Sequence, residues 1–367
     1  AIARLAGPFS GPGFNLIFRP HSDKEPDKRL KLTLPGVDLL ELNLTHELWT
    51  FPSVRADLGD IPSRVAKPGT EGKARADVFL RGIPYTQIVR DVTDTSIDKG
   101  KGKQNFIHFE PGLLIHVPNS AQVSDSPTIC RMASIPHGTT INAQGAAAVK
   151  VDGKSLPDIP FSNTAFKPFQ LDNTGVAPFF DGDQFKLDND KATRLPQDMQ
   201  PFLSKNSNES ITQKMVQDPN KSLIQHNAGK KFSQVIKFTV ATTPTKPLEK
   251  HANIAFLDGD LAVGANPNAK VGKVESTFWI STVVYSLDVK EKFVPGKGSD
   301  GKSKVLQLSP VEKDKFAKDT VPDFVFPPDK PTVEATQIQY SQSVNLIFNG
   351  LAWPHISVAT IIPVRPV

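Results

Sequence analysis

The stretch "SVNLIFNGLAWPHISVATIIPV", residues 343–364, decides how the rest of the chain is interpreted. Two runs of apolar and β-branched residues flank Asn349-Gly350, a dipeptide that supplies the positive φ angles of a tight type I′ turn. The stretch therefore predicts a β-hairpin near the end of the chain. Its second strand holds Trp353, Pro354 and His355 in succession. Because proline lacks an N–H and has a fixed φ, we expect Pro354 to kink this strand, break its ladder and display His355.

The remaining sequence is also typical of a mainly β protein. Its 367 residues include 32 Pro, 24 Gly and 23 Phe, which favours many short strands joined by turns and loops. Residues 11–145 contain about six strand patterns in succession, and strands resume between residues 230 and 364. In residues 40–48 leucines alternate with Glu41, Asn43, Thr45 and Glu47, which predicts a half-buried strand. We expect one antiparallel, calycin- or lipocalin-like β-barrel domain over 1–367, because closure removes exposed sheet edges.

Residues 146–229 interrupt the strand pattern. This segment is rich in Asp, Asn, Pro and Lys, yet it contains several phenylalanines, whereas disordered tracts are usually poor in aromatic residues. It predicts an irregular insertion packed on the barrel, with short helices near 196–205 and 211–225.

Composition and motifs exclude several function classes. The formal charge of +5 is a mild excess without a nucleic-acid-binding signature, and no apolar run reaches the roughly 20 residues of a membrane helix. Nucleotide-binding, serine hydrolase and zinc protease motifs are absent, so we expect any enzymatic activity to depend on a cofactor. Cys130 is the single cysteine, which excludes an intrachain disulfide and a cysteine-based zinc site, and we expect it to be a buried apolar residue. Oligomeric state stays open, as does whether the soluble protein is cytoplasmic or secreted after processing.

His355 is the candidate ligand among the histidines that lie in apolar strands. Ser357 and Ala359 share its side of the predicted strand, and their small side chains leave space beside the imidazole. That space suits a flat ligand held against the ring, as a haem iron requires. The competing interpretation is a face packed under the insertion.

Several blocks carry a resemblance to known proteins: "GPGFNLIFRP", "LLELNLTHELWTFP", "IHFEPGLLIHVP", "RMASIPHGTTINAQG" and "IQYSQSVNLIFNGLAWPHISVAT". Together they resemble a bacterial and fungal family labelled as haem-binding proteins by sequence. The ending is also similar to that of nitrobindin-like haem barrels, whose last strand carries the histidine that holds the iron. This resemblance implies that His355 is the axial haem ligand.

The leading hypothesis is a barrel that binds haem or a similar flat hydrophobic ligand, for storage, transport, or nitric oxide or peroxide chemistry. His355 would hold the iron with Trp353 beside it, and His137 and Tyr85, both next to prolines, would line the opposite side of the pocket. Two alternatives remain: a carrier of a colourless lipophilic ligand, and a structural or interaction protein whose barrel is filled by side chains.

Overall fold

The structure is a computed structural model of the 367-residue chain. It describes residues 2–19, 39–52, 61–63, 78–93, 105–118, 128–135, 139–146, 148–151, 167–170, 185–189, 192, 194–196, 198–202, 210–242, 270–286, 332–348 and 351–364. All structural statements below concern these residues.

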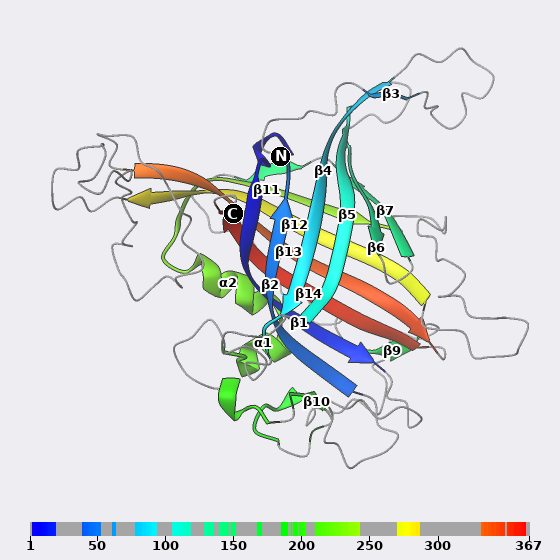
Figure 1. The fold of residues 1–367 in the computed structure, drawn as a ribbon, viewed down its shortest axis with the longest axis vertical. Coiled ribbons are helices and arrows are strands. Elements are labelled where there is room, and N and C mark those ends of the chain that lie inside the picture. The colour runs from blue at the N-terminus through cyan, green and yellow to red at the C-terminus, as the bar shows by residue number, and fades with distance from the viewer. Residues whose placement is uncertain are drawn as a thin grey trace, which may run out of the picture.

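Ten antiparallel strands close into a barrel, which confirms the predicted fold class (Figure 1). Around the barrel, each strand pairs with the next and the last pairs with the first: β1 (Pro8–Arg19), β14 (Leu351–Pro363), β13 (Thr332–Phe348), β12 (Lys270–Ser286), β11 (Lys231–Ala241), β7 (Thr139–Ala146), β6 (Thr128–Ile135), β5 (Asn105–Val117), β4 (Val78–Asp91) and β2 (Leu39–Thr50). Four short strands lie beside the ring: β3 (Ile61–Ser63), β8 (Val149–Val151), β9 (Phe169–Gln170) and β10 (Arg194–Leu195). The closing contacts are therefore between distant parts of the sequence, such as β1 with β14.

The predicted hairpin is present as β13 and β14, which pair from Phe348↔Leu351 to Ile338↔Ile361. The turn residues 349 and 350 lie outside the described residues. The expectation that Pro354 breaks the ladder is wrong, because its pairing with Asn345 on β13 is continuous with the pairs on either side. On the other edge of β14, pairing with β1 ends at His355 and pairing with β9 begins at Ala352. Pro354 lies between these two partners, where a missing N–H costs no ladder bond.

From Leu42 to Thr45, strand β2 is buried on both faces, whereas His46 and Thr50 are exposed, so the prediction of a half-buried strand is wrong for the first part of the strand. Its leucine face joins an apolar cluster outside the barrel, here called the outer cluster, with members that include Phe14, Leu16, Phe18, Leu40, Leu42, Leu44, Phe185, Met215, Val216 and Val358. The alternate face, with Asn43, Thr45 and Glu47, points into the barrel and is at most 4% exposed. The polar residues of β2 are therefore the inner ones, and the insertion covers its leucines.

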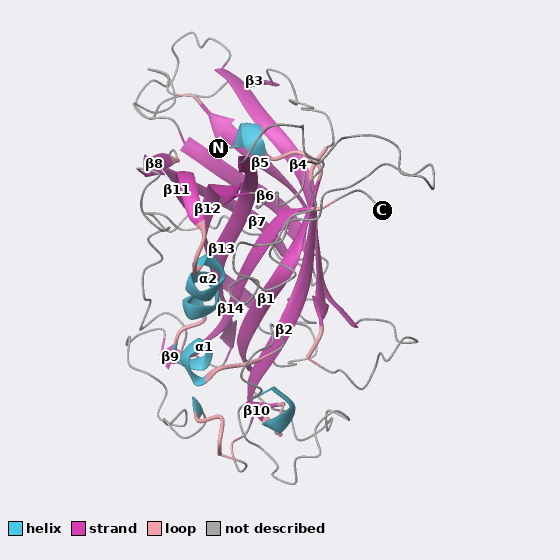
Figure 2. Cartoon of the chain, turned by 90° about the vertical axis from the view of Figure 1, so that its left-hand side faces the viewer, coloured by secondary structure: helices cyan, strands magenta, loops and turns pink. Residues whose placement is uncertain are grey.

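The insertion supplies the cover for this wall of the barrel. Helices α1 (Gln213–Gln217) and α2 (Asn220–Asn227) lie against the strands, with α2 contacting β14, and a short 3-10 turn spans Gln200–Phe202 (Figure 2). The helix predicted over 211–225 is thus two helices, and among the described residues of 196–205 the helical part is the short turn at Gln200–Phe202. Among the described residues, no helix is long and apolar enough to cross a membrane.

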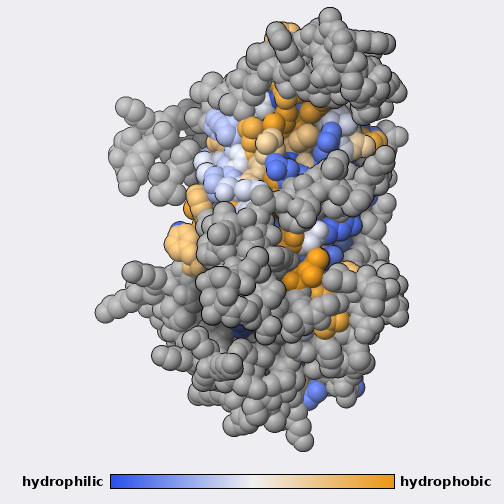
Figure 3. All heavy atoms as spheres, turned by 90° about the vertical axis from the view of Figure 1, so that its right-hand side faces the viewer, coloured by the Kyte–Doolittle hydropathy of each residue, from blue (hydrophilic) through white to orange (hydrophobic). Residues whose placement is uncertain are grey.

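A second apolar cluster, here called the inner cluster, lies inside the barrel and extends from Phe9 and Ile361 to Val274. It draws side chains from all ten strands, and its centre is Trp49, whose ring stacks on Tyr85 at 5.0 Å and lies near Phe278 and Tyr340. Outside the barrel, Phe109 of β5 and Met132 of β6 are each 43% exposed, and orange apolar residues are visible on that side of the molecule (Figure 3). Cys130 on β6 is half-buried rather than fully buried.

Candidate functional site

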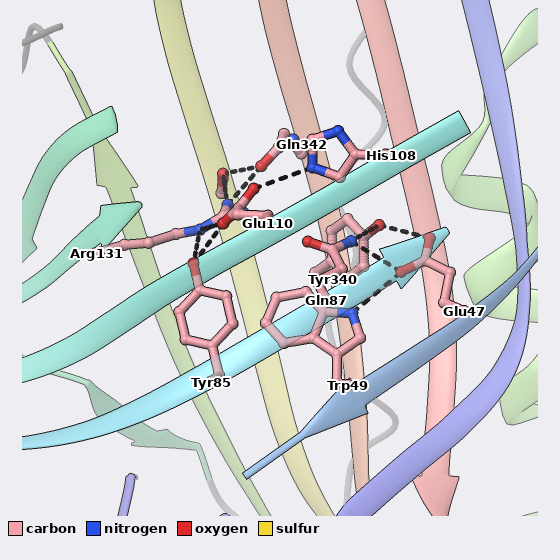
Figure 4. Close-up of polar contacts among 10 residues, drawn as sticks. Glu47, Trp49, Tyr85, Gln87, His108, Glu110, Arg131, Tyr340 and Gln342 are labelled. Atoms are coloured by element: carbon pink, nitrogen blue, oxygen red, sulfur yellow. Dashed lines mark hydrogen bonds and ion pairs between the residues drawn. The ribbon is translucent and has the colours of Figure 1, made fainter. Parts of the chain in front are cut away.

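A buried guanidinium organises the first of two polar groups inside the barrel, here called the Arg131 network (Figure 4). Arg131 Nη2 donates to Glu110 Oε1 at 2.6 Å, and Nε donates to the same oxygen and to the Tyr85 hydroxyl. Arg131 Nη1 donates to Ser276 Oγ at 2.9 Å and to the side-chain oxygen of Gln342. The remaining member, His108, lies with Nε2 3.2 Å from Glu110 Oε2. Arg131 and Glu110 are 1% and 0% exposed, so the pair is cut off from water.

The charges of this pair are fixed by their mutual contact. Burial alone would raise the pKa of Glu110, but Arg131, His108 and Tyr85 lower that pKa to about 2. Burial would lower the pKa of Arg131, whereas Glu110 and Tyr85 raise it. Burial also raises the pKa of Tyr85. The pair is therefore ionised at neutral pH and the phenol is not. Arg131 also lies 5.6 Å from the ring centre of Phe278, within cation–π range.

The second group, here called the Glu47 network, contains a carboxyl group without a cationic partner among the described residues. Tyr340 donates its hydroxyl hydrogen to Glu47 Oε1 at 2.6 Å, while Trp49 Nε1 and Gln87 Nε2 donate to Oε2 at 3.1 and 3.0 Å (Figure 4). Burial raises the pKa of Glu47, although these donors and His108 lower it in part. Burial and the neighbouring carboxyl group also raise the pKa of Tyr340.

Beyond these networks, strand pairing defines two bands of inward side chains. Direct cross-strand partners point to the same face of a sheet. The first band, here called the polar row, runs across β12, β13, β14, β1 and β2 and consists of Ser276, Gln342, Ser357, Asn15 and Asn43. The next band, here called the histidine row, consists of Val274, Val344, His355, Ile17 and Glu41; Val274 belongs to the inner cluster and Val344 packs against it. The inner wall thus changes from hydrogen-bonding side chains in the polar row to largely apolar side chains in the histidine row, and His355 lies in the middle of the histidine row.

The structure does not bring the four sequence-predicted ligand residues together. His355 is half-buried on the inner wall, flanked by Val344 and Ile17. Tyr85 is bonded to Glu110 and Arg131 in the layer of Trp49. Ala359, the cross-strand partner of Tyr340 in that layer, lies four residues from His355, or roughly 13 Å along a strand. Trp353, which pairs with Leu346, lies on the same side of β14 as His355 by strand alternation and packs with members of the outer cluster, and His137 lies outside the described residues.

The two networks are suited to holding shape rather than to acid–base chemistry. Ser276 Oγ donates to Gln342 Oε1 at 2.8 Å and accepts from Arg131, so it has no adjacent base to activate it. Within the part of the chain that the structure describes, no three His, Cys, Asp or Glu side chains gather as a metal site would require. Among the described residues, the inner wall therefore offers hydrogen-bonding groups, apolar side chains and the imidazole of His355.

Sequence reasoning missed Glu47, Glu110, Arg131 and Gln342 as inward residues. The available signal was the placement of charged and amide residues in the middle of long strand patterns, such as Glu110 in "NFIHFEPG" and Gln342 in "IQYSQSVN". Reading such a strand as half-buried assigns its polar face to solvent.

Comparisons of the chain with protein-family models, with curated proteins and with solved structures returned no match.

Proposed function

We propose that this protein is a binding barrel that holds a small, largely apolar ligand against the histidine row. The observation that carries the proposal is the position of His355, half-buried on the inner face of the closing strand between apolar neighbours on both adjacent strands. A wall of this kind, apolar with a few placed polar groups, is typical of small-molecule sites.

Haem is the first ligand to test. His355 would hold the iron, and Val344 and Ile17 would contact the apolar macrocycle. Arg19 lies two residues beyond Ile17 and already pairs with Glu41 at 3.1 Å, so a propionate would have to compete with that carboxylate for the guanidinium. Bound haem would supply an iron centre able to take nitric oxide or peroxide. The Tyr85 hydroxyl is already hydrogen-bonded to Glu110 and Arg131. Among the predicted ligand residues that the structure describes, His355 would therefore be the axial ligand.

A filled barrel is the competing function, and the inner cluster favours it. Trp49, Phe278 and Tyr340 are at most 2% exposed and pack against one another across the barrel. The cluster also reaches Val274 and Val344 of the histidine row, so the proposed site is restricted to the wall around His355 and Ile17. A calycin-like carrier of a colourless lipophilic ligand would use the same wall.

Absorption spectroscopy of the purified protein during hemin titration tests the haem form of the proposal. We expect a Soret band that saturates at one hemin per chain and that His355→Ala shifts or removes. His46→Ala is the matched control, because His46 is exposed on β2 and contacts Ser10. If wild-type protein gives no saturable band, haem is not the ligand. If, in addition, the apolar fluorophore N-phenyl-1-naphthylamine does not bind, the binding-barrel proposal fails.

A further inference from the structure

Three buried oxygen atoms on the inner wall have no hydrogen-bond partner within the part of the chain that the structure describes: Asn15 Oδ1, Thr45 Oγ1 and Gln87 Oε1. Their residues are 7%, 2% and 3% exposed. Buried polar atoms are nearly always paired, because an unpaired one loses its bond to water without a replacement. Three such atoms on one wall therefore require a donor that these strands do not supply.

The three oxygens follow a line from the polar row toward the Glu47 network. Asn15 belongs to the polar row, and Thr45 is the cross-strand partner of Gly13, two residues before Asn15. A Cβ added to Gly13 would lie 2.5 Å from Thr45 Oγ1, so this hydroxyl lies over bare backbone. Gln87 continues the line, since its Nε2 donates to Glu47 Oε2 and to the Tyr340 hydroxyl while its Oε1 stays unpaired.

The electrostatic surroundings of this line favour a donor and disfavour an anion. Glu47 lies at one end, and no described cation pairs with it. Arg131 is committed to Glu110, and Arg19 to Glu41. A ligand carboxylate would meet oxygen acceptors and a buried carboxyl group, whereas a hydroxyl, an amide N–H or an ammonium group would donate a hydrogen bond to the nearest of these oxygens.

We propose that Asn15, Thr45 and Gln87 form the head-group site of the barrel, and that it takes a neutral or cationic hydrogen-bond donor attached to an apolar body. This inference rests on the proposed binding function and defines its ligand class. The histidine row contacts the apolar body, and the acceptor line contacts the head group. The propionates of haem accept hydrogen bonds and do not supply this donor.

Displacement of N-phenyl-1-naphthylamine by four twelve-carbon competitors tests the head-group site. We expect dodecanol and dodecylamine to displace the fluorophore at concentrations about tenfold lower than dodecane or dodecanoate, as one hydrogen bond gained or lost would give. Asn15→Leu and Thr45→Val should bring the four competitors to similar affinities. Thr50→Val is the matched control, because Thr50 is an exposed threonine on the same strand.

Melting of the unliganded variants gives a second readout. Because the replaced oxygens have no partner, Asn15→Leu and Thr45→Val should melt no lower than the wild type. A melting temperature several degrees lower would show that these oxygens bond within the protein and would overturn the inference. Equal displacement by all four competitors would also overturn it while leaving the binding function intact. Failure of the fluorophore to bind the wild type would refute both.

Discussion

Replacement of Lys230 by methionine should change how the stability of the protein depends on pH. Lys230 follows α2, is 7% exposed, and donates its ammonium hydrogen to Gln337 Oε1 on the outer wall at 2.6 Å. Burial lowers its pKa from 10.5 to about 7. Between these values the unfolded chain binds a proton that the folded chain does not, so the free energy of unfolding rises with pH in this window. The expected slope is about 1.4 kcal/mol per pH unit, and it disappears below pH 7, where both states are protonated.

Urea denaturation at pH 7.5, 8.5 and 9.5 measures this slope. Lys230→Met removes the titrating group, so the stability of the variant relative to the wild type should fall by about 2–3 kcal/mol over these two pH units. Lys221→Met is the matched control, since Lys221 lies on α2 with its side chain 44% exposed, and this variant keeps Lys230 and therefore its contribution to the slope. His226, whose pKa burial and Lys230 lower to about 4, titrates below the window. If wild type and Lys230→Met show the same pH dependence, Lys230 is not neutral in the folded protein and the reasoning is wrong.

Three further predictions concern the barrel and its cover. Arg131→Met leaves Glu110 ionised and buried without its cation, and it should cost about 3–5 kcal/mol in urea denaturation, with a smaller loss when Glu110→Leu is added. Equal losses in the single and double variants would count against the ion pair. Gly145→Ala places a methyl group 1.7 Å from the Thr239 carbonyl oxygen at the seam of β7 and β11, and we expect a loss of at least 1–3 kcal/mol in the same assay; an unchanged midpoint would contradict this close contact. Leu223→Ala should loosen α2 from the outer cluster at a cost of about 2–5 kcal/mol, measured by urea denaturation and by faster proteolysis after residue 210, and wild-type resistance would show that α2 is held by other contacts.

The barrel could be predicted from the sequence because its strands carry a period-two pattern and its last hairpin carries a turn dipeptide. Which face of β2 points into the barrel could not be predicted from the sequence. In a half-buried strand the leucines face the core, whereas here a second layer of protein covers Leu40, Leu42 and Leu44, and the barrel interior accepts Glu47. Glu47 is tolerated there because Trp49, Gln87 and Tyr340 lie within hydrogen-bond range, and β4 and β13 supply two of them from distant parts of the chain.

The candidate site shows the same limit. The side of β14 that His355 shares with Ser357 and Ala359 could be read from alternation alone, and it is the inner face. The neighbours of His355 could not be predicted from the sequence. Ile17 and Val344 lie beside His355 because of the register in which β1 and β13 pair with β14, and the whole barrel sets that register. Tyr85 drew attention as the residue after a proline, but its partners Glu110 and Arg131 come from β5 and β6, and no local pattern links the three.

The pairing of β1 with β14 has a consequence for synthesis of the protein. It joins Phe9 to Pro363, so the barrel cannot close on the ribosome until β14 has emerged. The leucine face of β2 must likewise wait for the insertion that covers it. During translation the nascent chain therefore exposes an apolar hairpin face and unpaired strand edges, which are binding sites for chaperones and starting points for aggregation. Low growth temperature and chaperone co-expression should consequently raise the yield of soluble protein more than changes to the folded surface do.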